Sequence, residues 1–108
     1  MQYFVSASGG PSFHNREEAL ELLEGLVLPG LDAVMALEAK GTIRAGGLPV
    51  GQRAFMFIIE APDNAALDEL LRELPLWPLL EWEVIPLESV AAREAHERRV
   101  VAAMKAGK

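Results

Sequence analysis

The side chains best suited to chemistry are acidic residues in predicted strands. Because side chains alternate along a strand, Glu81 and Glu83 share one face in residues 81–85. An enclosed carboxylate keeps its proton more readily, since desolvation disfavours the charged form, and this suits proton transfer at neutral pH. Glu83 is therefore a candidate catalytic acid or base, and Glu60, at the end of another predicted strand, is a second. The alternative is that these glutamates form ion pairs at a sheet end or interface with Arg44, Arg53 or Arg72.

Other side chains are candidates for binding a substrate. Arg44 is the basic residue of the predicted strand 43–50, where its guanidinium would suit a carboxylate or lactone oxygen. The alternative for Arg44 is an interfacial ion pair. His14 follows the first predicted strand, either at a pocket mouth, where histidine can carry protons, or as an exposed loop residue. Phe57 and Trp82 are candidates for lining the pocket, and the alternative is that they only anchor packing.

Neither a metal nor a cofactor is predicted. His14 and His96 do not have the spacing of a two-histidine helical motif. Gly9-Gly10 and Gly46-Gly47 match neither a phosphate-binding loop nor a dinucleotide fingerprint. Gly46-Gly47 instead suggests a bulge or a place where another backbone or a ligand comes close. The chain has no cysteine, which excludes disulfides, thiol nucleophiles and cysteine-based metal sites.

Composition limits the partners. With 108 residues of which 51% are hydrophobic, the chain is rich in apolar side chains for a small monomer, so we expect a homodimer or higher homo-oligomer. A net charge of −6 argues against nucleic acid and anionic membrane surfaces. The apolar runs are shorter than the ~20 residues of a membrane span. No secretory signal is recognisable, so a cytoplasmic location is expected.

The order of predicted elements is βαββαβ, the split arrangement of an α+β, ferredoxin-like fold with an antiparallel sheet. Pro29 predicts a kink or break near residues 25–30 of the first helix.

Residues 1–88 form the predicted domain and residues 89–108 a C-terminal helical extension. Val100, Val101 and Met104 of that extension either dock on a neighbouring subunit or belong to a partly frayed surface helix. The strands are predicted at 3–8, 43–50, 53–60 and 80–87, and the main helices at 15–41 and 62–74.

The third predicted strand indicates how the sheet is covered. Residues 54–59 are apolar without alternation, so both faces of this strand need cover. Helices on one face leave the other open, and that face receives either Phe55, Phe57 and Ile59 or Met56 and Ile58. Two such sheets facing each other bury both sets, which predicts a dimeric α+β barrel.

One stretch carries a family resemblance. Leu74-Pro75-Leu76-Trp77-Pro78 joins a helix end to a rigid turn, and Glu83-Val84-Ile85-Pro86-Leu87 follows as a strand. This pattern resembles the muconolactone delta-isomerase family, and the resemblance extends without gaps from about Gly41 to Leu87. In the strand beginning at Gly41, Arg44 matches the family pattern, whereas the family's histidine, tryptophans and second arginine are replaced. The other matching residues are Gly41, Gly51 and Asn64.

The resemblance implies a ferredoxin-like subunit of a dimeric α+β barrel and a cofactor-independent proton shift within a small lactone or organic acid. By that comparison Glu83 or Glu60 would be the acid or base, Arg44 the anchor of the substrate's oxygen atoms, and His14 a second proton carrier. A noncatalytic binding or assembly module is the main alternative, since bulky strand residues would fill the interior. A cofactor-independent monooxygenase on the same fold is another, because the fold supports several chemistries.

Overall fold

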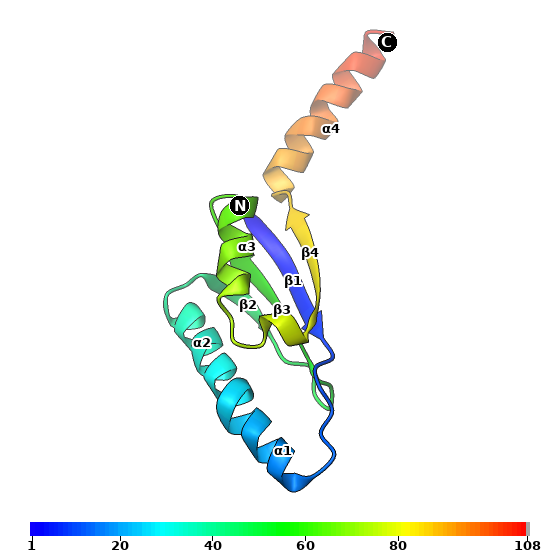
Figure 1. Cartoon of the computed structure of the whole chain (residues 1–108). Helices are drawn as coiled ribbons and strands as arrows, with labels where there is room; N and C mark the ends of the chain where they lie inside the picture. The colour runs from blue at the N-terminus through cyan, green and yellow to red at the C-terminus, as the bar shows by residue number, and fades with distance from the viewer. Residues whose placement is uncertain (108) are drawn as a thin grey trace.

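The chain folds as one antiparallel sheet with its main helices on one side. A computed structural model describes residues 1–107, so Lys108 of the predicted extension lies outside the described residues. The strand order is β2-β3-β1-β4, which confirms the predicted ferredoxin-like α+β class (Figure 1). The elements are β1 (Gln2–Ser8), α1 (Arg16–Leu22), η1 (Leu23–Val27), α2 (Leu28–Ala39), β2 (Ile43–Gly47), β3 (Ala54–Glu60), α3 (Asn64–Arg72), η2 (Trp77–Leu79), β4 (Glu81–Leu87) and α4 (Val90–Lys105).

Strand register decides which side chains face the helices. In β1, Tyr3, Val5 and Ala7 are buried. Their antiparallel partners in β3 are Ile59, Phe57 and Phe55, so these residues share the helix-covered face. The intervening residues of β3, Met56 and Ile58, therefore lie on the open face.

The first long helix contains a π turn at the place where the sequence predicted a kink or a break. Asn15 caps it, since its side chain accepts a hydrogen bond from the Glu18 backbone N–H. Between α1 and α2, residues 23–27 widen into a π turn in which the Leu28 N–H donates to the Leu23 carbonyl. Pro29, which has no N–H to donate, follows directly. The wider turn accommodates the proline without a break in the helix.

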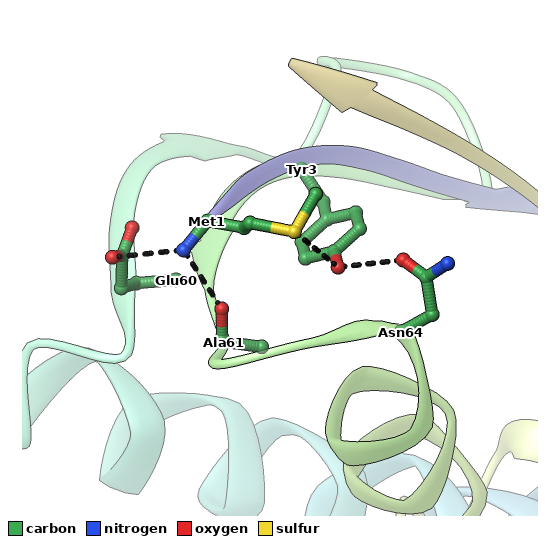
Figure 2. Close-up of polar contacts among 5 residues, drawn as sticks. All are labelled: Met1, Tyr3, Glu60, Ala61 and Asn64. Carbon is green, nitrogen blue, oxygen red and sulfur yellow. Dashed lines mark hydrogen bonds and ion pairs between the residues drawn. The ribbon is translucent and has the colours of Figure 1, made fainter. Parts of the chain in front are cut away.

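At the end of the sheet where β1 begins and β3 ends, polar contacts join β1, the end of β3 and α3 (Figure 2). The Tyr3 hydroxyl donates to Asn64 Oδ1 at 2.7 Å. The amino group of Met1 donates to the Ala61 carbonyl at 2.9 Å and lies 3.4 Å from Glu60 Oε1. These contacts fix the start of α3 against the central strand.

The Tyr3 hydroxyl provides a measurable part of this stability. For Tyr3→Phe we expect unfolding free energy to fall by about 1 kcal/mol, because one hydrogen bond is lost without a cavity. Urea unfolding should show a lower midpoint with an unchanged slope. Asn64→Ala and the double variant complete the cycle, and additive losses would show that the two side chains do not interact.

Strand β2 reaches β3 through a bulge and a glycine. Ile43 pairs with Ile59 and Ala45 with Ile58, so Arg44 is an extra residue in the ladder. Gly46 follows with a φ of 115°, and a Cβ on it would lie 2.2 Å from the Met56 carbonyl oxygen. Of the alternatives predicted for Gly46-Gly47, the close backbone approach is found at Gly46, whereas the bulge lies before the glycines, at Arg44.

Helix α4 projects from the end of β4 and packs against no other described element (Figure 1). Ser89 caps it by accepting a hydrogen bond from the Ala92 N–H at 3.1 Å. Every described residue of α4 is exposed, and the molecule is 69 Å long in consequence.

Candidate functional site

An apolar cavity of about 270 Å³ opens at the end of the sheet opposite α4. It lies between the α1, η1 and α2 helical segments, the C-terminal end of β1, the N-terminal start of β3, and the turn around η2. Most of its surface is aliphatic or aromatic, as in small-molecule sites generally. The lining consists of Ala7, Gly9, Gly10, Pro11, Phe13, Leu22, Leu23, Val27, Leu31, Leu48, Gln52, Arg53, Ala54, Phe55, Leu76 and Leu80.

The loop after β1 forms one wall of this cavity. Gly9 and Gly10 have φ values of 87° and 110°, a backbone conformation that glycine adopts without strain. The Gly9 N–H donates to the Arg53 carbonyl at 3.1 Å, so the loop is tied to the start of β3. Pro11 and Phe13 are thereby held at the cavity edge.

Arg53 is the one charged side chain in the lining. Its Nη1 donates to the Pro11 carbonyl at 3.0 Å, and its guanidinium carbon lies 5.7 Å from the centroid of the Phe13 ring. None of the ion pairs within residues 1–107 includes Arg53. A guanidinium with remaining donors beside apolar walls is suited to binding the carboxylate or carbonyl oxygen of an apolar molecule.

The lining does not supply an acid or base. Gln52 is its other long polar side chain, and neither an amide nor a guanidinium is an effective proton acceptor. A neighbouring groove shares Pro11, Phe13 and Leu22 with the cavity, and the carboxylates Glu18 and Glu21 line that groove. These carboxylates therefore line a space that adjoins the cavity.

The acidic residues predicted to be catalytic lie away from this cavity. Glu83 is exposed on the open face, opposite Ser6 of β1. Glu60 ends β3 at the opposite end of the sheet, next to the amino group of Met1. The structure does not bring these two carboxylates together.

The predicted basic residues are also separate. Arg44 is exposed at the bulge of β2, and the ion pairs described for residues 1–107 do not join it to a strand glutamate. His14 is an exposed loop residue whose backbone N–H donates to Glu18 Oε2 at 2.9 Å. Neither lines the cavity.

The two aromatic candidates lie on the helix-covered face. Phe57 is buried in the core, with its ring centroid 5.2 Å from that of Phe55. Trp82 meets Phe55 edge to face at 5.4 Å and donates from Nε1 to the Trp77 carbonyl at 3.0 Å. Trp82 also lines a narrow space of about 30 Å³ that shares Leu31, Phe55, Leu76 and Leu80 with the cavity. Of the six candidates, Trp82 is thus the one nearest to the enclosed space.

Sequence reasoning considered Arg53 only as a partner for the strand glutamates. One signal was present, since Arg53 is the cation that directly precedes the most apolar strand. A residue just before the first residue of a strand lies at the end of the sheet, where a ligand reaches it more easily than a residue in the middle of the strand. What the sequence did not show is that the glycine loop and the η2 turn both reach this position.

The fold and cavity together define a ferredoxin-like α+β protein with an apolar ligand-sized space between helices and sheet. A sequence model of muconolactone delta-isomerase matches residues 21–93, so the chain belongs to the muconolactone delta-isomerase family. The structure is similar to the crystal structure of muconolactone isomerase at 3.3 Å resolution, with a TM-score of 0.68 and 24% sequence identity. That match covers 82% of this chain and 90% of the other. No curated protein sequence matches the chain.

The described residues form neither a membrane-spanning helix nor a cluster of metal ligands. Within residues 1–107, no helix combines the length and apolar character needed to cross a membrane. The same residues contain no group of three or more histidine, aspartate or glutamate side chains placed to hold a metal ion.

Proposed function

We propose that this protein binds a small lactone or organic acid in the apolar cavity and catalyses a cofactor-independent proton shift within it. The observation that carries the proposal is the position of Arg53 at a largely apolar cavity in a member of the muconolactone delta-isomerase family. Arg53 would bind the ligand's carboxylate or carbonyl oxygen, and the aliphatic wall would take its carbon skeleton. We propose the cytoplasm as its location.

The identity of the acid or base is a separate part of this proposal. Glu83, on β4, remains the leading candidate, and Arg44, on the opposite edge strand β2, is proposed as a second anchor, provided that a second copy covers the open face and encloses both. Glu60 and His14 remain candidates for a second proton carrier, and Phe57 and Trp82 for shaping the pocket. Glu18 and Glu21 enter as alternatives because they line the groove beside the cavity.

A homodimer through the open face supports this arrangement. Ala45, Ile58, Phe4 and Ile85 occupy one row across all strands of the sheet on that face. Ile85 is 43% exposed and Met56, in the next row, is 40% exposed. A matching sheet on a second copy would remove these side chains from water.

A noncatalytic binding module is the second candidate function. One observation favours it: the side chains that line the cavity include no carboxylate, imidazole or amine able to accept a proton. In that case Arg53 and the apolar wall would hold an organic acid without changing it.

Proton exchange separates the two functions. We expect the wild-type protein to exchange deuterium from solvent into one or more unsaturated lactones, observed by NMR, and Glu83→Gln and Arg44→Ala to slow that exchange by about tenfold or more. Lys40→Ala, which removes an exposed cation that does not line the cavity, is the matched control. Background exchange in every protein, including wild type, would contradict the isomerase proposal. Ligand-induced shifts without exchange would favour the binding module.

A further inference from the structure

Helix α4 has the features of an arm that binds another molecule. It is 16 residues long, or about 24 Å, and it contacts no other described element of its own chain. An isolated helix of this length is only marginally stable in water. Its distal half nevertheless exposes large apolar side chains, with Val101 48% and Met104 70% exposed. A partner that covers these side chains would stabilise the helix.

Charge indicates which partner fits. Arg93, Arg98, Arg99 and Lys105 outnumber Glu94 and Glu97, so α4 has a net charge of +2. Residues 1–89 contain five basic and fourteen acidic side chains, a net charge of −9. A cationic arm on an anionic body is complementary to the body of a second copy.

One surface of the body combines the required acidic and apolar side chains. Glu17, Glu21 and Glu24 are spaced so that they follow one side of the α1 and η1 segments, and all are exposed. Leu20 of α1 is 54% exposed, and Leu28, the first residue of α2, is 53% exposed. On α4, Arg98, Val101 and Lys105 share one face by the same spacing rule, which gives two cations around an apolar residue.

The arm cannot reach this surface on its own chain. Strand β4 begins beside the cavity and ends at Leu87, so α4 starts at the opposite end of the sheet from α1 (Figure 1). The two helices point away from opposite ends of the 69 Å molecule. Any contact between α4 and the outer side of α1 must therefore join different copies.

We propose that α4 of one copy docks along the α1 and η1 segments of another, with Val101 against Leu20 and with Arg98 and Lys105 against Glu17, Glu21 and Glu24. The contact is head to tail, so it joins different patches of the two copies and forms a ring or a filament. It is independent of the ligand in the cavity and distinct from the dimer through the open sheet face. Leu22 and Leu23 of the same segments line the cavity, so the proposed contact involves the helical wall of that cavity.

Cross-linking tests the position of the arm. The chain has no cysteine, so Leu20→Cys and Val101→Cys forms of the full chain can be co-expressed and oxidised mildly. We expect mass spectrometry to find peptides that join residues 20 and 101. The control combines Ile85→Cys, whose thiol lies on the open face of the sheet, with Val101→Cys. We expect this control to give little of the disulfide that joins residues 85 and 101. An 85 to 101 link at equal or higher yield would overturn the proposal, as would the absence of a 20 to 101 link.

Charge reversal tests the chemistry of the contact with folded variants. Arg98→Glu with Lys105→Glu should lower the sedimentation mass of the full chain, and Glu17→Lys with Glu21→Lys should do the same. All four residues are exposed, so near-ultraviolet circular dichroism, which reports the packing of Trp77 and Trp82 in the sheet domain, is expected to be unchanged. Combining both pairs should restore at least half of the lost mass, since the charges again oppose each other. A combined variant no larger than either parent would overturn the proposal.

Discussion

Gly46→Ala is expected to destabilise the protein by about 4 kcal/mol, because it adds backbone strain to a steric overlap. The φ of Gly46 is 115°, a conformation that residues with a Cβ rarely adopt. A Cβ at this position would lie 2.2 Å from the Met56 carbonyl oxygen and 2.7 Å from the Phe57 Cα. Both neighbours are backbone atoms of β3, so neither can move without breaking the ladder. Against a typical total stability of about 5–15 kcal/mol, this loss is large.

Gly47→Ala is the matched control, because a Cβ on Gly47 would meet nothing within 4 Å. We expect its unfolding midpoint to remain close to that of the wild type. Urea or thermal unfolding of the two variants, followed by circular dichroism, measures the difference. Similar midpoints for Gly46→Ala and Gly47→Ala would show that β2 can shift away from β3 at little cost.

Arg53→Met is expected to weaken binding of a small apolar carboxylate by about tenfold to a hundredfold, the range for losing a hydrogen bond to a charged group. Methionine keeps the apolar stem of the side chain and removes only the charged donors. Isothermal titration or ligand-observed NMR with a panel of cyclic and unsaturated carboxylic acids would measure the change. The methyl esters of the same acids should bind to wild type and variant with smaller differences, because they lack the negative charge.

Two other substitutions make this result specific. Lys40→Met removes the same charge from an exposed position, so it reports any general effect of net charge. Arg44→Met tests the anchor predicted from the sequence. If Arg44→Met weakens binding and Arg53→Met does not, the ligand lies on the open sheet face and the cavity is not the site.

The sequence predicted the fold well because its patterns are local. Leu67 and Leu71 are buried as the helical spacing required, and Asp63 caps α3 by accepting a hydrogen bond from the Ala66 N–H at 2.8 Å. Pro86 is tolerated because β4 is an edge strand, where one side of the ladder needs no donor. Alternation alone left two options for β3, and the register with β1 resolved them.

The candidate site was harder to predict, because it is assembled from distant parts of the chain. Its walls come from the loop after β1, the π turn, the start of β3 and the turn at η2, and no spacing rule connects these segments. The sequence pointed instead to Glu83 and Arg44, whose chemistry is visible residue by residue. Their roles remain predictions, while the position of Arg53 required the tertiary structure.

The central position of β1 has a consequence for folding. Gln2 pairs with Glu60 on one side and with Leu87 on the other. The first strand to be synthesised therefore gains its second neighbour only when β4, the last strand, has been made. Pairings between residues so far apart in sequence close large loops, which slows folding relative to helical proteins. During synthesis, Tyr3 and Val5 stay without their strand partners until most of the chain has been made. We therefore expect a nascent chain to be most prone to aggregation just before β4 emerges, and closure of β4 on β1 to complete the domain.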